Sequence, residues 1–335
     1  MKVSWPSKAA FNAIDQCVVM TLNCRASSTN WLDFMRKTTL FKQLINAPEI
    51  LLLPGVHDVL SARIGAQAGF QAMTGGGYSA SATLLGQPDT SQLSLTEMAD
   101  HYARICDVID VPFFGDGDTG FGNVTNVART VRMYERAGLA GMFIEDQVFP
   151  KRCGHMVGKD VIPAEEMISK LKAALDARQD PDFVIMARTD ANAVNGLDDA
   201  LHRMALYNET GVDLLFVEAP RNVDEMRRIC NELEGPNLAN MIEGGATPVL
   251  SLDELSDIGF AAVTYPVAAT FVVAKAMKAF MTHLAENGTT IGYDPDMLQF
   301  EDFNEIIDLA GLRNREETYL NYASGLVGTK PGGSH

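Results

Sequence analysis

A thiol, an imidazole and two cationic side chains fall within five residues, in the sequence Lys-Arg-Cys-Gly-His at positions 151–155. A thiol among cations loses its proton more readily than a thiol in an apolar core, so Cys153 is a candidate for proton chemistry. A basic surface loop with an incidental cysteine would have the same sequence. The choice between these interpretations depends on what the rest of the chain places around the loop.

Polar and charged residues follow a series of short apolar runs along the chain. They occupy positions 74–77, 116–118, 145–147, 188–190, 218 and 240–243. If the runs are neighbouring parallel strands, these residues gather at one end of the sheet. Carboxylates directly after four different runs therefore indicate a candidate active site.

Hard oxygen ligands come from two consecutive runs. Asp116 and Asp118 flank a glycine after one run, and Glu145 follows the next. Carboxylates that converge in this way suit magnesium or manganese, which keep positions open for water and substrate oxygens. The alternative is ordinary turn chemistry, since Asp-Gly-Asp is also a common turn sequence. Asp89 belongs to a preceding loop that can lie over the same point.

Arg188 directly follows an apolar run, so its guanidinium can project over the strand ends. There it can bind a substrate carboxylate as a two-pronged donor. It can also form a salt bridge with Glu145 or Glu218, and the two roles are compatible.

The apolar runs alternate with amphipathic segments from residue 50 onward. Eight runs suit buried strands: 50–54, 71–74, 111–115, 141–145, 183–187, 214–217, 238–242 and 261–265. Amphipathic segments with apolar residues at three- and four-residue steps are 96–109, 126–137, 164–177, 197–207 and 224–233. Eight strand-helix units predict an α/β fold, a parallel (β/α)8 barrel of the TIM type. A doubly wound sheet is the alternative, but the turn at 55–58 lacks the G-x-G-x-x-G pattern of dinucleotide sites.

Three residues mark expected helix ends. Asn126 is the expected N-cap of the segment 126–137, and Gly138 and Gly211 stand where helices would stop.

Composition bounds the class of protein. The 335 residues carry a formal net charge of −16 and 47% hydrophobic residues, as in a globular protein. The negative charge argues against nonspecific binding to nucleic acid or to anionic membranes. The five cysteines are scattered and odd in number, which predicts neither a disulfide framework nor a zinc site and favours the cytoplasm. No segment matches a signal peptide or a membrane span.

The chain is predicted to divide into three parts. Residues 1–37 form an N-terminal extension, residues 38–288 the barrel, and residues 289–335 C-terminal helices and a tail. The apolar helix expected at 270–284 is rich in Met and Phe, which indicates core or a subunit interface rather than a cofactor pocket.

Four motifs, in this order and spacing, resemble the isocitrate lyase and phosphoenolpyruvate mutase superfamily. They are Asp-Gly-Asp-Thr-Gly-Phe-Gly at 116–122, Ile-Glu-Asp-Gln at 144–147, the loop at 151–155, and Ala-Arg-Thr-Asp at 187–190. The resemblance covers about residues 38–288. It implies a magnesium-binding (β/α)8 barrel, usually a homotetramer in which neighbouring subunits exchange a C-terminal helix.

The resemblance also implies roles for individual residues. Asp116 resembles the direct metal ligand, Asp118 and Glu145 resemble carboxylates that hold the waters of the metal, and Asp89 lies nearby. The implied substrate contacts are Gly76, Gly77, Tyr78, Gly154, His155, Arg188 and Asn240.

Cys153 implies a particular chemistry within this family. Branches that cleave carbon–carbon bonds carry a cysteine in this loop, whereas phosphorus–carbon branches usually lack it. The implied reaction is a retro-aldol type cleavage of a 2-hydroxy acid to an α-keto acid, such as pyruvate, and a carboxylate. Arg188 and the metal would stabilise the developing negative charge, and Cys153 would protonate the enolate.

The substrate is less well determined by the resemblance. Thr74 stands where methylisocitrate lyases commonly carry tyrosine, and Asn-Met-Ile-Glu-Gly-Gly at 240–245 departs from their Thr-Glu-Phe-Gly form. These departures favour the branch for smaller malate-like acids, with 2,3-dimethylmalate-like substrates first. The alternatives are a methylisocitrate lyase, an oxaloacetate hydrolase or decarboxylase, and a non-catalytic barrel that binds a carboxylate. A phosphonate mutase is disfavoured by Cys153.

Overall fold

The computed structural model describes residues 35–154, 158–293 and 296–327. Residue contacts separate residues 37–335, as one compact unit, from residues 1–36. The predicted N-terminal extension therefore lies almost wholly outside the described residues. The predicted division of the chain after residue 288 stays a prediction.

Eight parallel strands form a closed barrel. They are β1 Leu51–Pro54, β2 Met73–Gly75, β3 Phe113–Asp116, β4 Gly141–Glu145, β5 Val184–Thr189, β6 Leu214–Val217, β7 Leu238–Asn240 and β8 Ala262–Tyr265. One part of the barrel runs β2-β3-β4-β5-β6 and the other β1-β8-β7. The amide of Val56 donates to Thr74 O (2.9 Å) and that of Leu215 to Pro236 O (3.0 Å), which joins the two parts at both seams. The predicted (β/α)8 barrel is thus confirmed.

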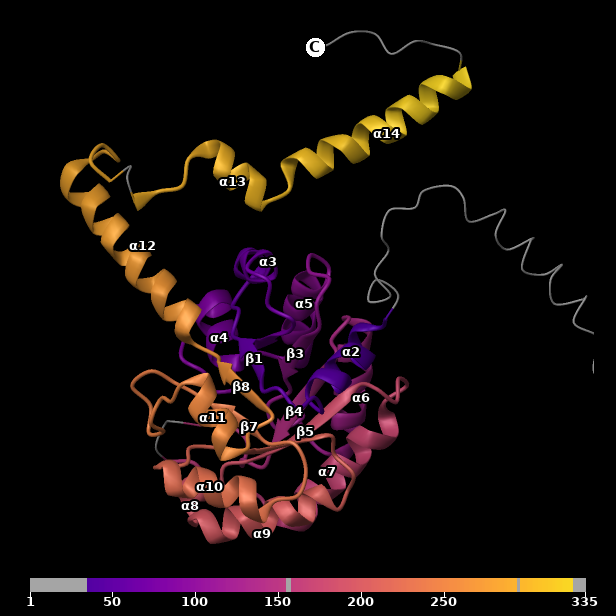
Figure 1. Cartoon of the computed structure of the whole chain (residues 1–335), viewed down its shortest axis with the longest axis vertical. Helices are drawn as coiled ribbons and strands as arrows, with labels where there is room; N and C mark the ends of the chain where they lie inside the picture. Colours follow the sequence, from indigo (N-terminus) through magenta and orange to yellow (C-terminus); the bar gives the residue numbers. More distant parts are fainter. Residues whose placement is uncertain (1–34, 155–157, 294–295, 328–335) are drawn as a thin grey trace, which may run out of the picture. The chain divides into compact units, whose positions relative to one another are not determined.

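Helices surround the strands (Figure 1). They are α2 Lys37–Leu44, α3 Val59–Gln67, α4 Gly77–Leu85, α5 Leu95–Cys106, α6 Val124–Arg136, α7 Ala164–Ala177, α8 Ala191–Val194, α9 Leu197–Asn208, α10 Val223–Glu232 and α11 Leu252–Ile258. All five amphipathic segments are helical. The expectation that Asn126 is an N-cap is wrong, because Asn123 caps α6 and its side chain accepts from the amides of Thr125 and Asn126.

Glycines end two of these helices as expected. Gly138 and Gly211 follow α6 and α9, each with φ of 88°. This left-handed conformation lets the chain turn away from a helix at no steric cost to glycine.

Helix α2 covers the amino-terminal opening of the barrel. Phe41 of α2 is fully buried there and stacks on Phe114 of β3, with ring centroids 5.2 Å apart. Thr38 fixes the helix by donating to Asp180, just before β5 (2.7 Å). Because α2 closes this end, a ligand can enter only from the carboxyl ends of the strands.

The C-terminal helices are α12 Ala268–Asn287, α13 Phe300–Ile306 and α14 Leu309–Val327. None of their described residues is buried, although many are apolar. The exposed side chains include Val272, Met277, Met281, Phe300, Tyr319 and Leu320. An exposed apolar surface of this kind indicates an interaction surface. Exchange of a helix between subunits stays a prediction.

Among the described residues, no helix combines the length and the apolar character needed to cross a membrane.

Candidate active site

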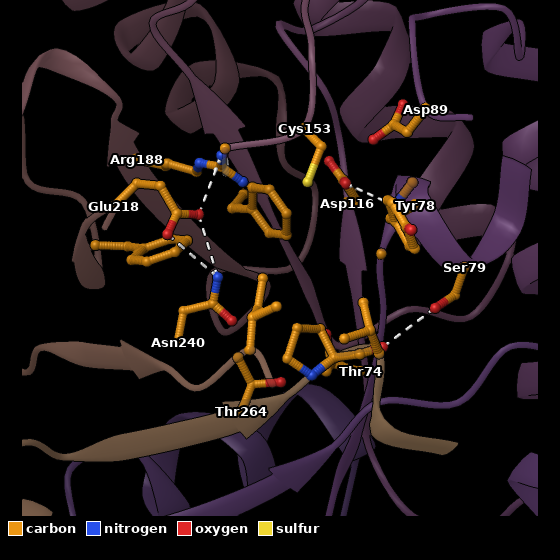
Figure 2. A pocket seen from close by; sticks show the side chains of 18 of the residues that line it. Thr74, Tyr78, Ser79, Asp89, Asp116, Cys153, Arg188, Glu218, Asn240 and Thr264 are labelled. Carbon is orange, nitrogen blue, oxygen red and sulfur yellow. Dashed lines mark hydrogen bonds and ion pairs between the residues drawn. The ribbon is translucent and has the colours of Figure 1, made fainter. Parts of the chain in front are cut away.

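A cavity of about 690 Å³, including the space at its open mouth, lies at the carboxyl ends of the strands. Its polar lining consists of Thr74, Gly76, Gly77, Tyr78, Ser79, Asp89, Asp116, Lys151, Cys153, Gly154, Arg188, Glu218, Asn240 and Thr264 (Figure 2). Several polar groups that converge on one concave site are typical of a small-molecule site. The structure therefore brings most of the predicted site residues to one place, although their roles stay predictions.

The Asp-Gly-Asp turn after β3 folds back on its own carboxylate. Asp118 has φ of 48°, and its amide donates to Asp116 Oδ1 at 2.8 Å. A Cβ added to Gly117 would lie 2.6 Å from the carbonyl oxygen of Phe143, so only glycine fits between the two aspartates. The turn places both carboxylates at the mouth of the barrel.

Lys151 inserts its ammonium among these carboxylates. Its Nζ lies 2.8 Å from Asp89, 2.7 Å from Asp118 and 4.0 Å from Asp116, and the side chain is 2% exposed. Burial alone would lower the pKa of Lys151, but the surrounding carboxylates raise it well above its usual range. The lysine is therefore a fixed positive charge that offsets part of the acidic cluster.

Burial also acts on the acids. It raises the pKa of Asp118 to about 7, although Lys151 opposes the shift. Burial raises the pKa of Glu145 as well, with Arg188 opposing. Both carboxyls thus bind a proton more tightly than free acids, and a nearby cation would compete with that proton.

The cluster offers suitable donors for a hard divalent cation. Neither carboxylate oxygen of Glu145 accepts a hydrogen bond in the described part of the chain, and Glu145 is fully buried. Glu145 Oε2 has an ion pair with Arg188, which leaves its Oε1 without a partner in the described part of the chain. Buried carboxylate oxygens of this kind are the ligands, or the holders of ligand waters, that Mg²⁺ prefers. Yet residues 35–154, 158–293 and 296–327 contain no group of three or more His, Cys, Asp or Glu arranged to hold a metal directly. The observation in favour of a cation is thus the buried carboxylate of Glu145, and metal binding stays a prediction.

Arg188 forms ion pairs with three carboxylates, and its side chain is only 9% exposed. Its Nε lies 2.9 Å from Asp190, its Nη1 3.2 Å from Glu145 and its Nη2 3.1 Å from Glu218. Burial would lower the pKa of Arg188, but these three partners raise it further above its usual range. Both predicted roles are geometrically compatible, since Arg188 forms the salt bridges and also lines the cavity.

Cys153 lines the cavity with its sulfur pointing inward, between Arg188 and Asp116 (Figure 2). The side chain is half-buried. The next residue, Gly154, packs so closely on the opposite wall that an added Cβ would collide with Arg188 Nη2 and lie 2.7 Å from Glu218 Cγ. His155, also a predicted substrate contact, lies outside the described residues.

The amino end of α4 supplies the other polar wall. Gly76 is the N-cap of this helix, and Gly77 and Tyr78 begin it. The amide of Gly77 already donates to Asp116 Oδ2 (2.7 Å), so Gly77 orients a carboxylate of the protein. The amides of the first helical turn lack intrahelical acceptors and favour an anion. Because the amide of Gly77 is already used, the amides of Tyr78 and Ser79 are the ones that can bind a ligand.

The far wall is mainly apolar. It contains Phe114, Phe143, Met186, Phe216, Leu238 and Ile242. Two polar side chains interrupt it on neighbouring strands, since Asn240 of β7 pairs in register with Thr264 of β8. Asn240 Nδ2 donates to Glu218 at 3.1 Å, whereas Asn240 Oδ1 and Thr264 Oγ1 are buried with no partner among the described residues.

Sequence reasoning missed two contributors to this site. Lys151 was expected only as a cation near Cys153, and Thr264 was not singled out. The position of Thr264 within a predicted strand was the signal that could have found it. Glu218, by contrast, was expected as a salt-bridge partner of Arg188, and the ion pair is confirmed.

Comparisons with known proteins place the chain among enzymes of carboxylic and phosphonic acids. A family model described as Phosphoenolpyruvate phosphomutase matches residues 41–285. The 2,3-dimethylmalate lyase of Eubacterium barkeri is 45% identical over 291 residues, 87% of this chain and 100% of that protein. The chloroplastic carboxyvinyl-carboxyphosphonate phosphorylmutase of Arabidopsis thaliana is 44% identical over 299 residues, 88% of each chain. A 2-methylisocitrate lyase of Bacillus subtilis is 40% identical over 251 residues, 74% of this chain and 82% of that one.

Solved structures agree with this grouping. A crystal structure of 2,3-dimethylmalate lyase superposes with a TM-score of 0.81 at 32% identity, covering 85% of this chain and 96% of that one. Oxaloacetate acetylhydrolase with 3,3-difluorooxalacetate gives a TM-score of 0.79 at 30% identity, covering 89% and 99%. Phosphonopyruvate hydrolase with oxalate and Mg²⁺ gives 0.78 at 26% identity, covering 85% and 100%.

Proposed function

The chain belongs to the phosphoenolpyruvate mutase/isocitrate lyase superfamily, and from that premise we propose that it cleaves a malate-like 2-hydroxy dicarboxylate of the 2,3-dimethylmalate class in a Mg²⁺-dependent reaction. The chain is a carbon–carbon lyase of this superfamily. The observation that carries the choice of substrate and mechanism is the inward-pointing thiol of Cys153, which faces Arg188 and Asp116 across one cavity with an apolar far wall (Figure 2).

In the proposed complex the 2-carboxylate of the substrate lies between the amino end of α4 and Arg188. The amides of Tyr78 and Ser79 and the helix dipole favour negative charge at this point. The guanidinium is held by Asp190, Glu145 and Glu218, so it costs little reorganisation when it meets the substrate. A divalent cation beside Asp116 would polarise the hydroxyl oxygen of the substrate and favour loss of its proton.

The bond that breaks joins the hydroxyl-bearing carbon to its neighbour. The electrons of the oxygen form the carbonyl of an α-keto acid, and the electron pair of the broken bond passes to the second fragment as a carboxylate enolate. The hydroxyl proton passes to water. Cys153 donates its thiol proton to the α-carbon of the enolate, which yields the free carboxylate, and the thiolate then takes a proton from water, so the cycle consumes no net proton. Burial of the thiol beneath a bound substrate would keep it protonated until the enolate forms.

Charge favours a small dicarboxylate over a tricarboxylate. Within the described part of the chain, the cavity lining contains two cationic side chains, Lys151 and Arg188, and both are paired with carboxylates of the protein. A third substrate carboxylate would lie against apolar side chains such as Leu238 and Ile242, where burying an unpaired charge is costly. Methyl groups fit that wall.

Three other activities are competing candidates. The methylisocitrate lyases and the oxaloacetate acetylhydrolase among the similar proteins support carbon–carbon cleavage of related acids. The phosphorylmutase supports phosphorus–carbon chemistry, which the cysteine at position 153 disfavours.

The test is an incubation of the full-length protein with Mg²⁺ and 2,3-dimethylmalate, methylisocitrate, oxaloacetate or phosphonopyruvate, with the products identified by mass spectrometry. Pyruvate with propionate supports the proposal. Oxalate with acetate, or pyruvate released only from phosphonopyruvate, refutes it. Turnover that survives a chelator refutes the role of the metal.

We also propose that the protein assembles as a homotetramer through residues 268–327, with a C-terminal helix exchanged between subunits. The exposed apolar side chains of α12 and α14 support this assembly. The scattered cysteines support a cytoplasmic location. Light scattering of the purified protein measures the assembly, and a monomer would refute it.

A further inference from the structure

Lys159 is a buried cation close to the cavity but outside its lining. Its side chain is 3% exposed, and its Nζ lies 3.0 Å from Asp190 Oδ1. The same ammonium donates to the carbonyl oxygen of Gly154. One side chain therefore joins the backbone beside Cys153 to an acid at the end of β5.

Asp190, which pairs with Lys159, also binds the guanidinium of Arg188. Its two carboxylate oxygens accept from Arg188 Nε (2.9 Å) and Nη2 (3.1 Å). Its own amide donates to Asp146 Oδ1 at 2.9 Å, and both aspartates are fully buried. Because Asp146 fixes the backbone of Asp190, the Asp190 carboxylate can orient two cations. It holds Arg188 toward the cavity and Lys159 toward Gly154.

Gly154 also contacts Arg188 directly. An added Cβ at this residue would collide with Arg188 and with Glu218, so the Gly154 backbone rests directly on the guanidinium. The thiol segment and the arginine are thus joined twice, by direct packing and through the Lys159–Asp190 ion pair.

We propose that Lys159 is a positioning residue that locks the Cys153–Gly154 segment to Arg188 through Asp190. Without its ammonium, Gly154 O loses its donor and Asp190 loses one of its two cations. The segment then keeps only its packing on Arg188, and the distance from the Cys153 thiol to the charge that Arg188 stabilises is less tightly fixed. The positioning is independent of the substrate, whereas its effect on turnover rests on the proposed lyase function.

The first test measures local opening without any substrate. An arginine-specific protease is applied to the native full-length protein, and cleavage after Arg152, which is exposed, is followed by mass spectrometry. Lys159→Met should cleave there at least fivefold faster than the unmodified protein, while cleavage after Arg227 on α10 stays unchanged. Lys172→Met, which removes an exposed ion pair with Asp176, is the matched control and should cleave at the original rate.

The second test separates positioning from simple destabilisation. Lys159→Met should lower kcat at least tenfold with less than a threefold change in KM, and Lys159→Arg should restore both values to within threefold. Unchanged cleavage after Arg152 refutes the proposal even if the protein proves to have another activity. Equal acceleration at Arg227 refutes it too, because the lysine would then act on general stability. If Lys159→Met does not fold, Lys159→Gln is used instead: its side chain is one atom shorter than lysine and keeps an N–H donor without the charge, and the same outcomes apply.

Discussion

Replacement of Cys153 by serine should abolish most turnover while leaving the protein folded. The substitution exchanges one atom in a half-buried side chain, so it creates little empty space and should change the free energy of unfolding by less than about 1 kcal/mol. A serine hydroxyl is a far weaker acid than a thiol and cannot deliver the proton at the same rate.

The expected size of the effect follows from the role of a general acid. Such a group contributes about 10²- to 10⁴-fold to the rate, which corresponds to roughly 3–5 kcal/mol in the activation free energy. KM should change less than about threefold, because Arg188, Asp116 and the amino end of α4 remain in place. The assay follows pyruvate from 2,3-dimethylmalate at saturating Mg²⁺ and reads kcat and KM separately.

Cys230→Ser is the matched control. Cys230 lies on α10 away from the cavity, and burial raises the pKa of its thiol to about 12. This variant should turn over at the original rate. Turnover of Cys153→Ser within fivefold of the unmodified protein would contradict the acid role, and a large loss in Cys230→Ser would show that the assay reports folding instead.

Three further changes have defined outcomes. Burial raises the pKa of Asp118 to about 7, so its contribution to metal-free stability is complete below about pH 4 and is lost as pH rises through 7. Because Mg²⁺ competes with that proton, the rise in Tm on adding Mg²⁺ should grow from pH 6 to pH 8, and Asp118→Asn should flatten the trend. Tyr207→Phe removes a 2.9 Å hydrogen bond to the buried carboxylate of Asp146 and should cost about 1.5–3 kcal/mol in urea unfolding; a cost below about 0.5 kcal/mol would contradict this. Gly154→Ala should lower kcat/KM at least about tenfold, because its Cβ displaces Arg188, while Tm changes little; equal kinetics would show that the segment can move aside.

The barrel was predictable because most of its strands are buried along their whole length. Runs such as 141–145 and 214–217 read as continuous apolar segments, and both match the observed strands residue for residue. Helix α4 was not predicted, because its sequence lacks the alternation of polar and apolar residues that marks an amphipathic helix. Its sequence Gly-Tyr-Ser-Ala-Ser-Ala-Thr-Leu-Leu has mostly small residues and no polar face, so no helical period is visible.

The cap of α6 shows the limit of local pattern. Asn123 and Asn126 both suit the N-cap, and they form the two halves of one capping box. The choice of Asn123 adds almost a turn to the helix, which the sequence alone did not require. The N-cap therefore differs from the prediction by three residues, whereas the helix itself was predicted correctly.

The acids of the site and the ion pairs of Arg188 were predictable, but the ion pairs of Lys151 were not. Strand ends put Asp116, Glu145 and Arg188 at one place, because parallel strands share a carboxyl end. The position of Lys151 depends on a loop that returns to Asp89 across 62 residues, and no local pattern encodes that contact.

The most direct test of the proposed function compares kcat/KM for 2,3-dimethylmalate and for 2-methylisocitrate in the full-length protein at saturating Mg²⁺. The third carboxylate of methylisocitrate would be buried against apolar side chains such as Leu238 and Ile242 without a cation of its own. We expect a preference of about 10²-fold or more for the dimethylmalate. Equal values, or a preference for methylisocitrate, would contradict the proposal that this cavity is built for a small dicarboxylate.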